Sequence, residues 1–157
     1  MNKVQKFFIK NSVKAFLKIQ ASRFQTKRLN TLGYRLNRFI AQTIIKSKGI
    51  GQAQSLEELG TNWQKGFPAK KQVPITHQDK NTVYGEIHTP CPLRGTGDVD
   101  ACYKMMSYDR TIVEQGGGQF IVLESQAEKG KQKCKIAIRF QGEDTSDLIH
   151  AHKRYRQ

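Results

Sequence analysis

Cysteine is the residue type in this chain best suited to chemistry, and it occurs three times, at Cys91, Cys102 and Cys134. The three positions are far apart in the sequence, so only a folded domain could bring them together. Three thiolates and the imidazole of His88, three residues before Cys91, would complete a tetrahedral site for zinc or another divalent metal. The predicted metal ligands are therefore His88, Cys91, Cys102 and Cys134.

Two other interpretations of the cysteines stay open. Cys102 is expected in the first turn of a helix, where backbone amides and the helix dipole lower the pKa of a thiol, so it is the candidate catalytic nucleophile of a ligand pocket. Free cysteines also serve as small apolar core residues, and the chain has no Cys-x-x-Cys pair, the strongest spacing signal for a metal. An odd cysteine count indicates thiols in a reducing compartment, which predicts a cytoplasmic location.

Other side chains could assist a reaction or hold a ligand near the cysteines. Glu86 and Asp109 are the predicted catalytic carboxylates that would act as general bases beside Cys102. The turn before the Cys102 helix offers a guanidinium and backbone amides, which could bind a carboxylate or a phosphate. The predicted ligand-binding residues are Arg94, Thr96, Gly97 and Tyr103.

Capping residues and alternating apolar residues predict the elements that would position these side chains. Ser55 and Glu58 form a capping box for a helix over 56–65, and Asp98 caps a helix from 99 to about 115. Strands are expected at 82–88, 120–124 and 133–140, with an edge strand at 73–76. The predicted fold class is α+β, with an antiparallel sheet of about four strands and helices packed on one face, preceded by a basic helical N-terminal arm.

The arm carries the positive charge of the chain. Residues 1–56 hold no acid, whereas all 13 Asp and Glu residues follow them. Lysines at 3, 6, 10, 14 and 18 predict a first amphipathic helix with Phe7, Phe8 and Phe16 on its apolar side. A stripe of Leu29, Leu32, Leu36, Phe39 and Thr43 predicts a second helix with that stripe buried. The predicted domains are the arm 1–50, an α+β ligand-binding domain 51–143 and a basic tail 144–157.

The charge of the arm predicts an anionic partner for residues 1–48. That partner is a membrane surface or a nucleic acid, because either would pair with closely spaced Lys and Arg residues. No apolar run approaches the roughly 20 residues of a membrane-spanning helix. Peripheral attachment at the inner membrane face therefore stays open, and in a eukaryote the basic, acid-free N-terminus would indicate a mitochondrial location.

Several short motifs resemble those of one family. The motifs are Cys91-Pro92-Leu93, Cys102, the run Tyr108–Glu114, Gly130-x-x-x-Cys134-x-Ile136-x-Ile138, and the lead-in Ser55–Gly60 with Trp63. Together they resemble the L-2-amino-thiazoline-4-carboxylic acid hydrolase-like family over residues 55–140. The related vinyl reductase-type small-molecule-binding domains look similar.

The resemblance implies a compact domain that binds a small organic molecule, with the family's cysteines at Cys91, Cys102 and Cys134. In the hydrolase, the activity opens a cyclic amidine-type ring by breaking a C–N bond. One departure concerns the last hairpin, where vinyl reductase-type domains commonly have a further cysteine after a glutamate. Here Ala127 follows Glu124 by three residues, which weakens the case for a four-cysteine centre. The alternative function is nucleic-acid or membrane-surface binding through the arm.

Overall fold

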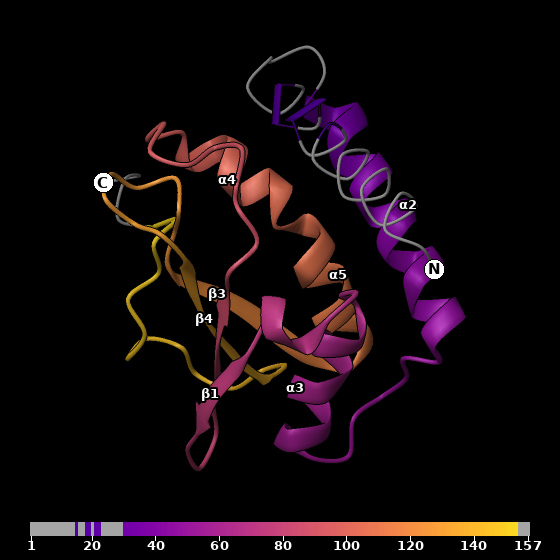
Figure 1. Ribbon diagram of the computed structural model, residues 1–157. Helices are drawn as coiled ribbons and strands as arrows, with labels where there is room; N and C mark the ends of the chain where they lie inside the picture. The colour runs from indigo at the N-terminus through magenta and orange to yellow at the C-terminus, as the bar shows by residue number, and fades with distance from the viewer. Residues whose placement is uncertain (1–14, 16–17, 20, 23–29, 154–157) are drawn as a thin grey trace.

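The computed structural model describes residues 15, 18–19, 21–22 and 30–153 of the chain (Figure 1). The long helices are α2 (Asn30–Lys48), α3 (Leu56–Lys65), α4 (Val99–Met105) and α5 (Ser107–Gln115). A short 3-10 turn, η1 (Lys70–Gln72), precedes four strands, which are β1 (Ile75–Gln78), β2 (Val83–Ile87), β3 (Gly118–Glu124) and β4 (Cys134–Phe140). The predicted first helix falls almost entirely outside the described residues.

The strands form one antiparallel sheet in the order β1-β2-β4-β3. In β2 the side chains alternate as expected, so that Val83, Gly85 and Ile87 are buried while Tyr84 and Glu86 are half-buried on the other face. Ile87 pairs with Cys134 at one end of β4, which fixes the cysteine on the helix-covered face of the sheet. The α+β fold and the antiparallel sheet are therefore confirmed.

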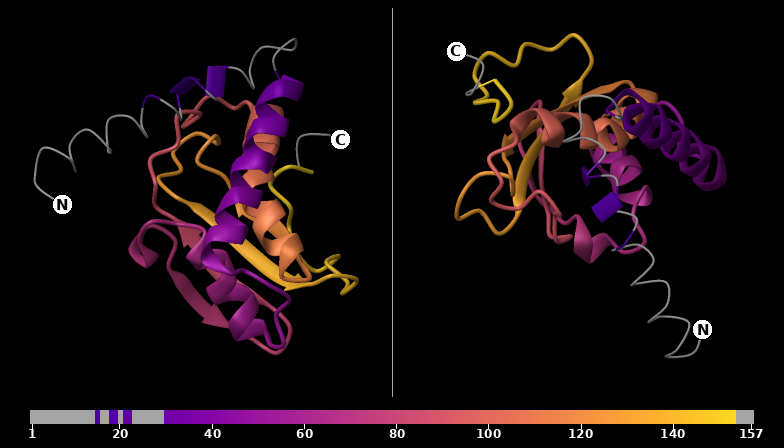
Figure 2. Two further views of the ribbon diagram at one scale, coloured as in Figure 1. Left: turned by 90° about the vertical axis from the view of Figure 1, so that its right-hand side faces the viewer. Right: turned by 90° about the horizontal axis from the view of Figure 1, so that it is seen from above.

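The helices form two layers on one face of the sheet. Leu59 and Trp63 of α3 and Val113 of α5 pack in one core cluster with Val83 and Ile136 of the sheet. Helix α2 lies against α4 and α5, on the side of them that is farther from the sheet (Figure 2). This order of layers leaves one side of α2 outermost.

Local sequence signals explain where α3 begins and ends. The Ser55 hydroxyl accepts a hydrogen bond from the Glu58 amide at 3.1 Å, and the Glu58 carboxylate accepts one from the Gln54 amide at 2.7 Å. These bonds satisfy amides that have no partner inside the helix. Gly66 follows the helix, where an added Cβ would collide with the side chain of Ile112. The predicted helix over 56–65 is confirmed.

The predicted helix from 99 to about 115 is two helices, and the expectation of one continuous helix was wrong. Asp98 caps α4 as expected, since its carboxylate accepts from the Ala101 amide at 2.9 Å. At Met106, however, ψ is 3° instead of the helical value near −42°. The side-chain amide of Asn37 in α2 donates to the Met105 carbonyl at 3.0 Å. A side chain that takes a carbonyl out of the helical ladder is an established cause of a bend.

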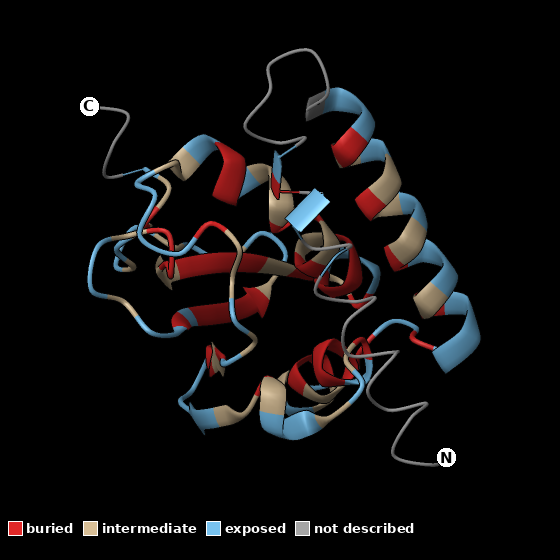
Figure 3. Cartoon of the chain, turned by 45° about the horizontal axis from the view of Figure 1, so that its top comes forward, coloured by how far each residue is buried: buried red, intermediate tan, exposed pale blue. Residues whose placement is uncertain are grey.

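Helix α2 confirms the predicted second helix but buries a different side. Asn37, Ala41 and Ile45 face α4 and α5, whereas Leu32 is 54% exposed and Phe39 is 66% exposed (Figure 3). The small Ala41 allows close packing, and on that side the Asn37 side chain donates to the Met105 carbonyl. The prediction that the leucine stripe is buried was therefore wrong for the described part of the stripe.

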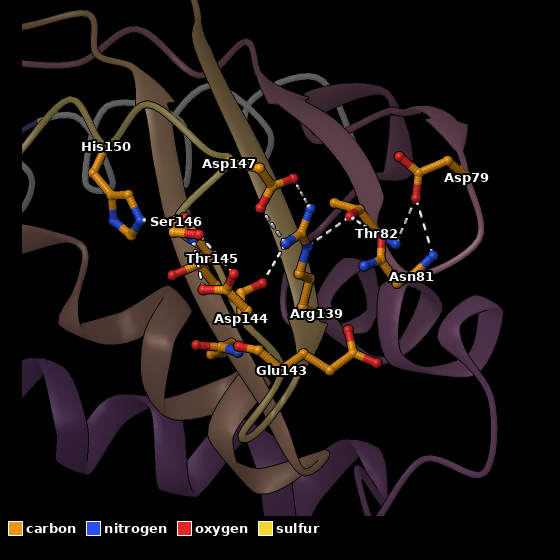
Figure 4. Close-up of polar contacts among 11 residues, drawn as sticks. Asp79, Asn81, Thr82, Arg139, Glu143, Asp144, Thr145, Ser146, Asp147 and His150 are labelled. Carbon is orange, nitrogen blue, oxygen red and sulfur yellow. Dashed lines mark hydrogen bonds and ion pairs between the residues drawn. The ribbon is translucent and has the colours of Figure 1, made fainter.

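The C-terminal segment, residues 141–153, crosses the second face of the sheet and passes the edge of β3. Arg139, which is 3% exposed, donates to both carboxylate oxygens of Asp147 at 2.7 Å, to the Asp144 carbonyl and to the Thr82 hydroxyl (Figure 4). The Ala151 amide then donates to the Val122 carbonyl at 2.8 Å. These contacts bring the end of the segment to α4.

Among the described helices, none is long and apolar enough to span a bilayer.

Candidate functional site

The three cysteines meet at one end of the core. Cys91 is half-buried after β2, Cys102 is 2% exposed in α4, and Cys134 is 1% exposed in β4. All three contact the same apolar cluster, and their thiols are close enough to influence one another electrostatically. All three thiols are free, and all three border the same part of the core.

Cys102 has two polar neighbours, both from segments that follow it in the sequence. Its sulfur lies 3.0 Å from the Ser125 hydroxyl and 3.3 Å from Nε2 of His152. The His152 ring also meets the ring of Tyr103 edge to face, with ring centroids 5.3 Å apart. The guanidinium of Arg110 lies 4.0 Å from the centre of the Tyr103 ring. A thiol with an imidazole at this distance has the arrangement of a nucleophile and its base.

Gln126, which is 0% exposed, organises the other side of the cluster. Its Oε1 accepts hydrogen bonds from the Cys91 amide at 3.1 Å and from Arg94, and its Nε2 donates to the Ile87 and Thr89 carbonyls at 3.2 and 2.9 Å. The Gln126 backbone amide also lies 3.3 Å from the sulfur of Cys134. One buried glutamine, through its side chain and its backbone amide, therefore connects the cysteine loop to the start of the last strand.

Arg94 is an exposed cation held in a fixed direction by neutral oxygens. Its guanidinium donates to the Gln126 side chain at 2.6 and 3.1 Å, and to the side chain and carbonyl of Gln132 at 3.1 and 2.9 Å. Within the described part of the chain it forms no ion pair. The guanidinium of Arg94 therefore lies near Cys91 among neutral oxygen acceptors.

Burial keeps the thiols protonated. It raises the pKa of Cys102 to about 12 and the pKa of Cys134 to about 11, and it also raises the pKa of Cys91. The expectation that the helix start lowers the pKa of Cys102 was wrong, because desolvation outweighs the dipole of a seven-residue helix whose N-terminus already holds the Asp98 carboxylate. A thiolate at Cys102 would need its proton to pass to His152.

The predicted anion site on the backbone of the loop is already occupied by the protein. The Gly97 amide donates to the Ala127 carbonyl, and the Gly95 amide donates to the Gln126 carbonyl, each at 2.9 Å. Thr96 donates its hydroxyl to the Leu93 carbonyl at 2.8 Å. Of the predicted ligand-binding residues, Arg94 and the 39% exposed Tyr103 therefore retain groups that face outward, whereas Gly97 and Thr96 shape the loop.

Glu86 and His88 lie away from the thiols. Strand alternation puts Glu86 on the sheet face opposite Ile87 and the core, where its carboxylate pairs with His88 and Lys133, each at 2.7 Å. Hydrogen bonds from these two partners lower the pKa of Glu86. The structure therefore does not bring Glu86 to Cys102 as a base, nor His88 to the cysteines as a fourth ligand. Within the described ranges, no three His, Cys, Asp or Glu side chains are grouped to hold a metal.

Asp109 is a buried carboxylic acid in the core. It accepts a hydrogen bond from the indole N–H of Trp63 at 2.9 Å, and burial raises its pKa to about 6. It is near enough to Cys134 to raise the pKa of that thiol. A strongly shifted acid beside a candidate site is a recognised mark of function, although a structural core acid gives the same shift.

Sequence reasoning missed three residues of this cluster, namely Ser125, Gln126 and His152. Gln126 lies between the strands expected at 120–124 and 133–140, and His152 lies in the predicted basic tail. Polar residues in such segments usually face water, so no local pattern distinguishes them. The position of His152 depends on tertiary contacts, because the C-terminal segment passes the edge of β3 before His152 reaches Cys102.

The raised pKa values predict slow alkylation of the native protein. At pH 8 a thiol with a pKa of about 12 is ionised in roughly one molecule in ten thousand, so iodoacetamide should modify half-buried Cys91 first and leave Cys102 and Cys134 intact until the protein unfolds. Peptide mass spectrometry after timed labelling measures this order. Rapid labelling of Cys102 that disappears in His152→Ala would show instead that the two residues share an ion pair.

No protein-family model, curated protein or solved structure matches this chain. The family resemblance therefore remains a prediction that rests on the quoted motifs.

Proposed function

We propose that this chain is a small-molecule-binding domain whose ligand lies against the cysteine cluster and Arg94. The observation that carries the proposal is the convergence of Cys91, Cys102 and Cys134 with His152 and a fixed guanidinium. Free thiols and an aromatic ring supply apolar contact, while a few polar groups orient a ligand. That combination is typical of sites for small organic molecules.

The chemistry beside the cluster favours an organic anion. Arg94 presents a planar donor group, and its described partners are neutral amide oxygens. A ligand carboxylate can pair with such a guanidinium in two parallel hydrogen bonds. The carboxylate of L-2-amino-thiazoline-4-carboxylic acid, the substrate class that the family resemblance implies, has this chemistry, and its sulfur-containing ring would suit a thiol-lined surface.

Hydrolysis of a cyclic C–N bond is the narrower form of the proposal. A water oxygen adds to the amidine carbon and becomes the oxygen of a carbamoyl group, the ring C–N bond breaks, and both protons of the water pass to the ring nitrogen, which leaves as a primary amine. His152, 3.3 Å from the sulfur of Cys102, is the base that the geometry favours, in place of Glu86. If Cys102 attacks first, its proton goes to His152 and the water then releases the thiol.

Calorimetric titration with L-2-amino-thiazoline-4-carboxylic acid tests the binding proposal. The wild-type chain should bind, and Arg94→Gln should weaken binding by about tenfold, the size expected for a partly screened charge-assisted hydrogen bond. Lys129→Gln, at an exposed cation in the turn after Gln126, is the matched control and should bind as the wild type does. Absence of heat in the wild type, or equal affinity in Arg94→Gln, would reject an anion site here.

A separate assay of amine release tests the hydrolysis step. Cys102→Ser and His152→Gln should retain binding and lose turnover. Turnover that persists in both variants would remove the thiol and its base from the mechanism and leave the binding proposal in place.

Nucleic-acid binding through the arm is the second candidate and rests on its charge. Twelve Lys and Arg residues with no acid occupy residues 1–56. Phosphate contacts would make affinity for duplex DNA fall steeply with salt. Binding that does not change between low and high salt would reject this candidate.

A further inference from the structure

Helix α2 presents large apolar side chains to solvent on the side that does not pack against the domain. This outer face of α2 consists of Leu32, Leu36, Phe39 and Ile40, which recur at spacings of three and four residues. Phe39 is 66% exposed and Leu32 is 54% exposed, while the neighbouring Leu36 and Ile40 are half-buried. Isolated exposed apolar residues are common, but a continuous stripe on one helix indicates an interaction surface.

The opposite side of α2 holds the helix firmly in place. Ala41 and Ile45 pack with Ile50 and Ile112, and the Asn37 side chain donates to the Met105 carbonyl at 3.0 Å. The helix therefore cannot turn its apolar stripe inward without breaking this packing. Helix α2 is the outer layer of the described part of the fold (Figures 2 and 3), and this packing fixes the stripe on its outer side.

Charge indicates what the outer face contacts. Arg35 lies one turn before Phe39, Lys46 lies two turns after it, and both are exposed. The first acid of the chain is Glu57, so α2 and everything before it in the sequence carry cations only. An apolar stripe bordered by cations matches a surface whose outer layer is anionic and whose interior is apolar.

We infer that the outer face of α2 docks in the plane of an anionic lipid surface, with Leu32 and Phe39 entering the boundary of the acyl chains. Interfacial helices of this kind place their apolar residues roughly 5–10 Å into the headgroup region and pair their cations with lipid phosphates. A nucleic acid would satisfy Arg35 and Lys46 but offers no apolar phase for Leu32. The inference does not depend on the cysteine site, which lies on other elements of the fold.

Co-sedimentation of the full chain with phosphatidylglycerol–phosphatidylcholine vesicles tests the inference. We expect the wild type to bind these vesicles more strongly than pure phosphatidylcholine vesicles. Phe39→Gln should weaken binding several-fold and the Leu32→Gln/Phe39→Gln pair by about tenfold or more, because each change removes a large apolar group from the boundary. Ile149→Gln is the matched control, since Ile149 is 68% exposed on the C-terminal segment, and it should bind as the wild type does.

A second pair of matched variants tests the cations on α2. Arg35→Gln/Lys46→Gln should weaken binding to anionic vesicles several-fold, whereas Lys80→Gln/Lys129→Gln, with the same change of net charge at exposed sites elsewhere, should not. Equal losses in the two double variants would mean that total charge, and not the position of the cations on α2, controls binding, and would overturn the inference.

A fluorescence readout separates α2 from the residues before it. Trp63 is the single native tryptophan and is 0% exposed, so the emission of an added Phe39→Trp can be followed by difference. Vesicles should shift that emission to shorter wavelength. Co-sedimentation without such a shift would assign membrane binding to residues 1–29 and overturn the inference. Two results with Phe39→Gln would also overturn the inference. One is binding to vesicles equal to that of the wild type. The other is the conversion of a dimer to a monomer by this substitution, in a protein that does not bind vesicles.

Discussion

Replacing Gln126 with alanine should lower the free energy of unfolding by about 3 kcal/mol or more, because at least two buried polar groups lose their partners at about 1–3 kcal/mol each. The Ile87 and Thr89 carbonyls would lose a donor, and the Cys91 amide would lose its acceptor. Urea unfolding followed by the fluorescence of buried Trp63 measures the change.

Gln132→Ala is the control for that variant. Gln132 also holds Arg94, through its side chain at 3.1 Å, but it is exposed, so water can replace the lost bond. We expect a change within about 0.5 kcal/mol. A loss below about 1 kcal/mol in Gln126→Ala would mean that the loop after β2 does not depend on this buried amide, and Arg94 would then lack the fixed direction on which the anion site rests.

Replacing Asp109 with asparagine should stabilise the protein at pH 8 and leave it nearly unchanged below pH 4. Burial raises the pKa of Asp109 to about 6 from its usual 3.8, so the folded state keeps a proton that the unfolded state releases between these values. Stability of the wild type therefore falls as pH rises through this window, by up to about 3 kcal/mol from a shift of roughly two pKa units. Asparagine keeps the acceptor for Trp63 and removes the charge.

The measurement is urea unfolding of both proteins at several pH values between 4 and 8. Glu114→Gln, an exposed acid on the same helix, should show the same pH dependence as the wild type. If Asp109→Asn is less stable than the wild type at pH 8, the carboxylate has a favourable partner when ionised, and its role in the site would have to be reconsidered.

Local patterns predicted most of the fold because the interactions behind them lie within a few residues. The Ser55 and Asp98 caps satisfy amides three residues onward, and the alternation of Val83, Gly85 and Ile87 follows from the pleat of a single strand. The pairing of Cys134 with Ile87, by contrast, follows from the register of the sheet, which no local pattern records.

Tertiary contacts determine the features of the fold and the site that local sequence patterns do not predict. Helix α2 has apolar residues on two sides, and the fit of Ala41 and Asn37 against α4 and α5 selected the side with fewer large groups. The helix of Cys102 was expected to lower its pKa, but the depth of burial, which no local pattern records, raised it. Gln126 and His152 reach the cluster only through the path of chain segments that look like loops in the sequence.

We propose that a small organic anion binds against the three cysteines. Titrating L-2-amino-thiazoline-4-carboxylic acid into protein labelled with ¹³C at cysteine alone, and recording the three Cβ resonances by NMR, tests it most directly. We predict saturable shifts of the Cys91 and Cys102 resonances, and much smaller shifts in Arg94→Gln at the same ligand concentration. Resonances that stay unchanged at saturating ligand, or that move equally in Arg94→Gln, would contradict the claim.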